Sequence, residues 1–299
     1  MSMAEPIIDW LNAQQENMLS LLADLVNIDS NSFDKVGVER VAGRLRTFFD
    51  NHAIPCETIP LPDHGDALRA VVSGGDGNRP ILLCGHRDTV FATGEVEKRP
   101  FTMHDGKAFG PGVADMKPGL VINAFILAAF HKFGGHPNPL IGLFTGDEEI
   151  GSPSSKNIII AEAEKARLAF NSEPSRPNGN IVTKRKGGIF CYCAIKGVAA
   201  HSGGFFTDGR SAIEELAHKI QALHALTDVK KGTTINVGLV QGGQSVNTVA
   251  AEASCDFDIR YQETDERDDI LSQVRTICET VSVAGTSSKF CIRGEFQPL

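Results

Sequence analysis

Histidine and acidic residues that could bind metal recur along the first 180 residues. They follow three apolar runs and one glycine-rich loop, and they are His86 with Asp88, Asp115, Glu148 with Glu149, and Glu173. Considered one at a time, each has an ordinary explanation as a surface pair, a solvated turn or a loop cap. Together they offer one imidazole and several carboxylates, a set that suits a divalent cation such as zinc, cobalt or manganese. Their regular order favours a metal site.

The elements that must position these residues alternate between strands and helices. Buried strands are expected at 80–85, 140–145 and 167–170, and helices at 14–28, 38–52, 120–133 and 154–166. Such alternation is typical of an α/β domain whose mostly parallel sheet is covered on both faces. In open sheets of this kind, sites form at the carboxyl ends of the strands. That is where His86, the Glu148–Glu149 pair and Glu173 fall.

The pattern changes after residue 178, where proline, asparagine and glycine cluster. Beyond this boundary, strands and helices are expected in the order β-α-β-β-α-β, at 184–196, 210–227, 233–240, 249–261, 264–283 and 289–296. This order is that of a small ferredoxin-like unit. The sequence therefore predicts two domains.

The composition argues against several classes of protein. The 299 residues carry a net charge of −8, which argues against a nucleic-acid partner because such a partner requires a basic surface. The seven cysteines match no zinc knuckle and are read as reduced thiols of a cytoplasmic protein. The N-terminus has no signal-peptide pattern, and the longest apolar run is too short to span a bilayer. We expect a cytoplasmic protein without a membrane partner.

Four short motifs resemble those of one metallopeptidase family. They are Gly85-His-Arg-Asp-Thr-Val90, Gly110-x-Gly-x-x-Asp-Met-Lys117, Thr145-Gly-Asp-Glu-Glu-Ile-Gly151 and Ser172-Glu173-Pro174. The family is that of glutamate carboxypeptidase, acetylornithine deacetylase, succinyl-diaminopimelate desuccinylase and aminoacylase. The resemblance covers essentially the whole chain. It implies a catalytic domain at 1–178, an inserted ferredoxin-like dimerisation domain at 179–296, and a return to the catalytic domain that begins at 297–299.

The resemblance also implies roles for the candidate metal ligands. His86, Asp115 and Glu173 would hold one metal ion, and Asp115 would bridge to a second ion that Glu149 also binds. Zinc is the expected metal. Asp88 would orient the ring of His86 from behind, Glu148 would act as general base, and the peptide bond between Asp115 and Met116 would be cis.

The second domain supplies three further candidates through the same resemblance. They are His201 in Gly197-Val-Ala-Ala-His-Ser-Gly203, Asn247 in Gln241-Gly-Gly-Gln-Ser-Val-Asn247, and Arg260 in Asp258-Ile-Arg260. His201 would reach the partner's active site across a homodimer and stabilise the oxyanion. Asn247 would contact substrate, and Arg260 would grip a substrate carboxylate through its guanidinium fork. The ordinary alternatives are a loop histidine, a turn residue and an edge-strand charge.

One feature departs from the family pattern. Relatives continue beyond the small domain and supply a last histidine to the second metal, whereas no histidine follows His224 here. The second site is therefore expected to be one ligand short, and the chain to be a fragment or the product of an interrupted gene.

The functional expectation is a hydrolase of peptide or N-acyl amide bonds in small carboxylate-bearing substrates, similar to glutamate carboxypeptidase. Two alternatives stay open. An aminopeptidase of the same family would bind a substrate amine instead of a carboxylate on Arg260. A truncated, non-catalytic dimerising remnant would lack activity because the last histidine is missing.

Overall fold

The computed structural model describes residues 4–75 and 78–299, so the first three residues of the segment expected to show no signal-peptide pattern lie outside it. The chain divides into two compact units, Met1–Asn178 and Gly179–Leu299. The division falls in the segment rich in proline, asparagine and glycine. Among the described residues, no helix is both long and apolar enough to cross a membrane.

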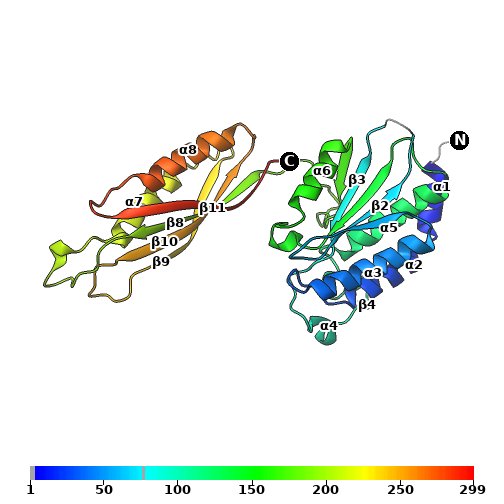
Figure 1. Ribbon diagram of the computed structural model, residues 1–299, viewed down its shortest axis with the longest axis horizontal. Helices are drawn as coiled ribbons and strands as arrows, with labels where there is room; N and C mark the ends of the chain where they lie inside the picture. Colours follow the sequence, from blue (N-terminus) through cyan, green and yellow to red (C-terminus); the bar gives the residue numbers. More distant parts are fainter. Residues whose placement is uncertain (1–3, 76–77) are drawn as a thin grey trace. The chain divides into compact units, whose positions relative to one another are not determined.

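The first unit is built on a five-stranded sheet (Figure 1). Its spatial order is β1 (Cys56–Ile59), β2 (Ala67–Val72), β6 (Leu140–Thr145), β3 (Ile81–His86) and β7 (Leu168–Asn171). β3 pairs in parallel with β6 and β7, while β2 runs antiparallel to β1 and β6. Four of the five strands therefore share one direction, which confirms the predicted mostly parallel α/β sheet. β1 and β2 were not anticipated from the sequence.

Helices cover both faces of this sheet because its strands are apolar on both sides (Figure 1). One core joins the sheet to α1 (Ala4–Asn12), α2 (Gln15–Val26), α3 (Lys35–Asn51) and α5 (Lys117–Lys132). The core on the other face packs under α6 (Lys156–Lys165). The neighbouring residues Leu82 and Leu83 of β3 point into opposite cores. The remaining elements are the short helix α4 (Glu95–Lys98), the 3-10 turn η1 (Glu148–Ile150) and the hairpin of β4 (Thr102–His104) and β5 (Lys107–Phe109).

The second unit has the predicted β-α-β-β-α-β order (Figure 1). Its elements are β8 (Gly187–Lys196), the 3-10 turn η2 (Phe206–Asp208), α7 (Ala212–Ala225), β9 (Thr234–Gly242), β10 (Glu252–Tyr261), α8 (Glu266–Glu279) and β11 (Ser287–Phe296). The sheet has the order β11-β8-β10-β9, and every neighbouring pair is antiparallel. Alternate residues of β8 and β10 point toward α7 and α8 and form the core of this unit. Among the described residues of this unit, no helix packs on the other face of the sheet.

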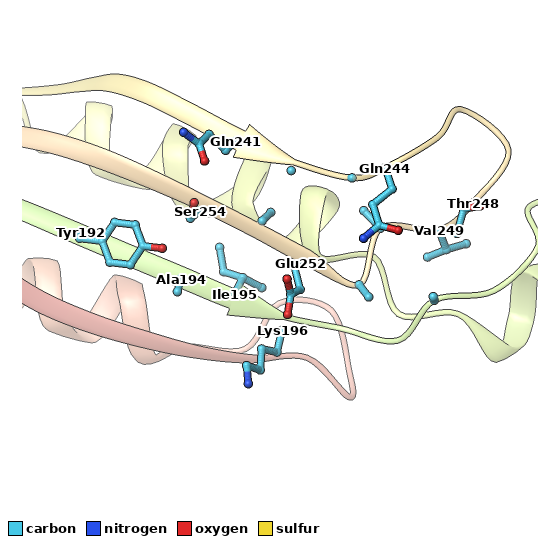
Figure 2. A pocket seen from close by; sticks show the side chains of 16 residues that line it. Tyr192, Ala194, Ile195, Lys196, Gln241, Gln244, Thr248, Val249, Glu252 and Ser254 are labelled. Carbon is cyan, nitrogen blue, oxygen red and sulfur yellow. The ribbon is translucent and has the colours of Figure 1, made fainter.

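A hollow of about 780 Å³ lies at one end of the second unit's sheet (Figure 2). Side chains from β8 and β10, including Tyr192, Lys196 and Glu252, border it together with Gln244 and Thr248. The last two belong to the loop that carries Asn247, so this predicted substrate loop forms part of the rim.

Candidate metal centre

His86 ends β3 and is almost completely buried, with 2% of its surface exposed. Its Nδ1 lies 3.0 Å from the carbonyl oxygen of Asp88 and 3.3 Å from Oδ1 of the same residue. A histidine held at one nitrogen presents the other in a fixed direction, as metal-binding histidines do. The Nε2 atom of His86 therefore faces away from Asp88 and is free to act as a ligand.

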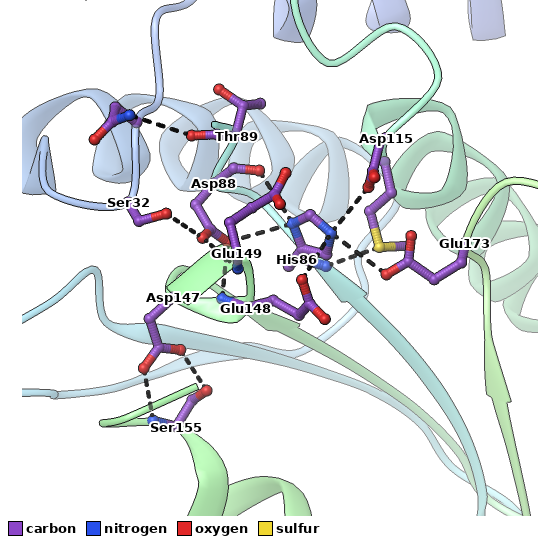
Figure 3. Close-up of polar contacts among 12 residues, drawn as sticks. Ser32, His86, Asp88, Thr89, Asp115, Asp147, Glu148, Glu149, Ser155 and Glu173 are labelled. Carbon is purple, nitrogen blue, oxygen red and sulfur yellow. Dashed lines mark hydrogen bonds and ion pairs between the residues drawn. The ribbon is translucent and has the colours of Figure 1, made fainter. Parts of the chain in front are cut away.

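Three carboxylates converge on that Nε2 atom (Figure 3). The distances are 3.2 Å to Asp115 Oδ1, 3.4 Å to Glu173 Oε1 and 3.6 Å to Glu148 Oε2. Nε2 nevertheless makes no hydrogen bond of good geometry, although it is buried. A buried nitrogen that lacks a partner and faces several carboxylates is suited to a cation.

The potential ligand atoms form two overlapping groups. One group contains His86, Asp115 and Glu149, and the other contains His86, Glu148 and Glu173, with the ligand atoms of each group within 4.8 Å of one another. Because both groups contain His86, and only its Nε2 atom is free of Asp88, they overlap and form one cluster of ligand atoms around that nitrogen. The structure thus brings together all of the metal ligands predicted from the sequence. It also places Glu148, the predicted base, 3.6 Å from Nε2, slightly farther than Asp115 and Glu173.

Asp88 supports both the imidazole and the carboxylates opposite it. Its side chain is fully buried and accepts hydrogen bonds from Ser32 Oγ (2.7 Å), Glu148 N (3.2 Å) and Glu149 N (3.1 Å). Burial alone would raise the pKa of Asp88, but contacts with His86, with Ser32 and with the backbone of Glu149 lower it. Asp88 therefore stays charged and fixes two parts of the site at once.

The 3-10 turn that carries Glu148 and Glu149 is held by a second buried carboxylate. Asp147 accepts hydrogen bonds from Ser154 N (2.7 Å), Ser155 N (3.0 Å) and Ser155 Oγ. Asp147 and Ser32 were not predicted from the sequence. Ser32 bonds to Asp88, which is distant along the chain, and Asp147 bonds to a loop that shows no regular pattern. The acidic run at 147–149 was the only local signal.

Asp115 lies in the glycine-rich loop that leads into α5. The Asp115–Met116 peptide bond is cis, as predicted. Met116 is buried, and its sulfur lies 3.1 Å from the backbone nitrogen of His86. Lys117 is also buried, and its Nζ donates to the carbonyl oxygen of Ile28 at 2.8 Å. These contacts fix the chain directly after Asp115.

The electrostatics of the cluster favour a bound positive charge. Burial raises the pKa of Glu148, Glu149 and Asp115, with the pKa of Glu149 reaching about 7. Burial opposes protonation of His86, yet its contacts with Asp88 and Glu173 raise its pKa to about 11. Burial would raise the pKa of Glu173, but its contact with His86 lowers that pKa below the ordinary value. Carboxylates this close together repel one another until a cation joins them. The residues therefore fit a divalent metal ion.

The second unit contains the other three predicted site residues. His201 is exposed, and its Nδ1 accepts hydrogen bonds from the backbone of Gly203 (3.1 Å) and Gly204 (3.2 Å). The backbone oxygen of Asn247 accepts from Ser202 N at 3.0 Å. The loops of His201 and Asn247 thus lie side by side.

Arg260 lies at the opposite end of the same sheet. It pairs with Gly188 near the start of β8. The His201 loop follows the other end of β8, and the Asn247 loop lies beside it. Eight residues of β10 separate the two ends, or about 25 Å at the usual strand rise. Arg260 Nε donates to Asp258 Oδ2 at 2.9 Å, and its guanidinium lies over two rings, those of Phe190 and Phe296. Within this unit, Arg260 and His201 cannot touch the same small molecule.

Comparisons with known proteins agree with this architecture. Residues 183–286 match the family described as "Peptidase dimerisation domain". The chain is 27% identical over 259 residues to carboxypeptidase G2 of Pseudomonas sp. (strain RS-16), which covers 85% of the chain and 62% of that protein. It is 30% identical over 240 residues to acetylornithine deacetylase of Erwinia tasmaniensis, which covers 74% of the chain and 61% of that protein. The chain thus spans about three fifths of the length of these curated relatives.

A solved structure extends the similarity to the fold of both units. The chain resembles a tripeptidase from Staphylococcus aureus with a TM-score of 0.77 and 19% identity, over 95% of this chain and 76% of the other. At this identity the likeness concerns the fold.

Proposed function

The chain is a relative of the M20 metallopeptidases and deacetylases. We propose that it takes part in the hydrolysis of a peptide or N-acyl amide bond at a two-metal centre. The substrate is a small molecule that carries a free carboxylate, and zinc is the metal. The observation that carries this proposal is the convergence of Asp115, Glu148 and Glu173 on the buried Nε2 of His86.

In this proposal His86, Asp115 and Glu173 hold one ion, and Asp115 with Glu149 contributes to the second. Divalent ions, when bound, lower the pKa of water and polarise an amide carbonyl. Support for the second ion comes from the ligand atoms of Asp115 and Glu149, which lie within 4.8 Å of one another in the same group. Asp88 keeps the His86 ring and the turn of Glu148 and Glu149 in register through its four contacts.

Glu148 moves the proton in this scheme. Its carboxylate is half exposed, and burial raises its pKa, which makes it a stronger base than an ordinary glutamate. Its Oε2 takes a proton from the attacking water and later gives that proton to the leaving nitrogen. The hydrogen bond from Glu148 N to Asp88 Oδ1 holds the backbone of Glu148 in place.

We assign Arg260 to the substrate carboxylate. Its Nε is engaged by Asp258 and its plane rests on Phe190 and Phe296, so the outer nitrogens of the fork remain available for a carboxylate. The aminopeptidase alternative predicts that a free substrate amine matters instead. Comparing a dipeptide with its C-terminal amide separates the two, because both keep the free amine: the amide should be a poor substrate only if Arg260 binds a carboxylate.

We further propose a homodimer formed by the second unit. β9 is an edge strand that exposes Leu239 and Val240, and exposed apolar edges favour pairing with another chain. The separation of His201 and Asn247 from Arg260 supports the predicted role of His201 on the partner's substrate. One subunit would grip the carboxylate, and the other would supply the oxyanion donor.

The test is the Glu148→Gln variant. We expect hydrolysis of N-acyl amino acids to fall by about 10²–10⁴-fold while the chain still binds zinc, because Glu148 is assigned proton transfer. Glu164→Gln, an exposed glutamate on α6, is the matched control and should behave like the wild type. Loss of zinc from Glu148→Gln would reassign Glu148 as a ligand, and unchanged hydrolysis would exclude it as the base.

A further inference from the structure

Asn123 is a fully buried polar residue in the middle of the apolar helix α5. Its side-chain amide makes two hydrogen bonds across the face of the sheet. Nδ2 donates to the carbonyl oxygen of Cys84 at 2.9 Å, and Oδ1 accepts from Ser172 Oγ at 2.6 Å. Both partners are far from Asn123 in sequence, so the amide connects α5 to two separate segments.

These two partners adjoin two proposed metal ligands. Cys84 lies two residues before His86 on β3, and Ser172 directly precedes Glu173. The pairing of β3 with β7 ends at Cys84 and Asn171. Beyond that point the backbone bond from Ser172 N to Cys84 O is long, at 3.4 Å. Asn123 therefore fastens the segment where sheet pairing no longer does.

Gly119, one turn earlier on α5, contacts the same segment. A Cβ atom at this position would lie 2.1 Å from the carbonyl oxygen of Ser172, so only glycine allows this approach. α5 therefore touches Ser172 at two places. The same helix begins at Lys117, two residues after Asp115, which makes it the element that links His86, Asp115 and Glu173.

We propose that Asn123 is a positioning residue of the metal centre, an inference that rests on the proposed metal site. Its amide holds the His86 strand and the Glu173 segment at a fixed separation, so that both ligands meet the same ion. Residues that orient metal ligands usually change metal affinity by about 10–100-fold when they are mutated.

Asn138 offers a matched control for the purely structural explanation. It is also buried, and its Nδ2 donates to the carbonyl oxygen of Arg79 at 2.8 Å. Arg79 lies just before the start of β3, at the end of the strand away from His86. Asn138→Leu thus removes a comparable side-chain to backbone bond in the same sheet without touching the ligand segments.

The experiment measures zinc affinity by competition with a chelator, and thermal stability of the zinc-free chain, for the wild type, Asn123→Leu and Asn138→Leu. We expect Asn123→Leu to weaken zinc binding by about 10–100-fold and Asn138→Leu to leave it within about twofold. Zinc affinity unchanged in Asn123→Leu, or lowered equally in Asn138→Leu, would overturn the proposal. A wild-type chain that binds no zinc would instead overturn the metal site itself.

Ser172 keeps the proposal testable if Asn123→Leu does not fold. Ser172→Ala removes one of the two hydrogen bonds and should weaken zinc binding, while Ser172→Thr keeps the hydroxyl and should restore it. A Ser172→Ala chain with wild-type affinity would contradict the positioning role. Because the readout is binding, it remains informative even if hydrolysis is not observed.

Discussion

The Asp88→Asn variant tests how one buried carboxylate supports both halves of the metal centre. Asp88 is fully buried, and each of its oxygens accepts a backbone bond, Oδ1 from Glu148 N and Oδ2 from Glu149 N. Asparagine has the same shape but only one acceptor oxygen. In either orientation, its NH₂ group faces one of these N–H donors. One backbone donor therefore loses its partner.

The expected loss of stability follows from this one unsatisfied backbone donor. An unsatisfied buried donor costs about 1–3 kcal/mol, so the free energy of unfolding should fall by about that amount. The loss of charge behind His86 and the shift of the turn should weaken zinc binding by about 10–100-fold. The assay combines chemical denaturation of the zinc-free chain with a zinc titration.

Asp34→Asn is the control for this substitution. Asp34 caps α3 by accepting a bond from Gly37 N at 3.0 Å, and asparagine caps a helix about as well as aspartate. This variant should change neither quantity measurably. If Asp88→Asn binds zinc as tightly as the wild type, the reasoning that assigns Asp88 a supporting role in the site is refuted.

Two further predictions concern the second unit. Arg260→Ala should raise KM for N-acyl amino acids more than it lowers kcat, because a carboxylate contact exists in both ground and transition states; Arg275→Ala, which also removes an arginine stacked on a phenylalanine, is the control, and an unchanged KM in Arg260→Ala would remove Arg260 from the site. Glu215→Gln should destabilise the fold by about 3–5 kcal/mol at pH 7, because the buried Lys219 loses its counter-charge at 2.8 Å and keeps only neutral acceptors, the carbonyl oxygens of Ile277 and Thr280. Burial opposes the charge of Glu215, but Lys219 and two backbone donors lower its pKa, so its stabilising effect is present above the ordinary pKa of 4.5 and disappears as the pH falls through the lowered value. Denaturation curves from pH 7 to 3 should therefore converge for the wild type and Glu215→Gln, and a constant difference would contradict this.

Much of the architecture could be predicted from local patterns, because helices and strands of the second unit alternate apolar residues with their own periods. The alternation of Ile189, Cys191 and Cys193 toward the core is one example. β1 escaped prediction because none of its four residues is buried and they give no apolar run. β2 was missed although it is mostly apolar, because Arg69 interrupts its run of apolar residues.

The residues of the site also fall into those that the sequence predicts and those that it does not. Motif residues such as His86 and Glu173 stand out because several chemical groups recur in order after strands. Supporting residues do not, because their partners are distant: Ser32 bonds to Asp88 across 56 residues, and Asn123 bonds to Ser172 across 49. Within an apolar helix, Asn123 reads only as an interruption of the pattern. Such pairs become visible only when the sheet brings the segments together.

The central claim is that this cluster binds two divalent cations through His86, Asp115, Glu149 and Glu173. The direct measurement is a crystal structure of the zinc-loaded chain with anomalous scattering recorded at the zinc edge. The account predicts two neighbouring peaks, one bound by His86 Nε2 and Glu173, the other by Glu149, with Asp115 bound to both. A single peak, zinc that binds elsewhere in the chain, or no peak next to His86 Nε2 would contradict the account.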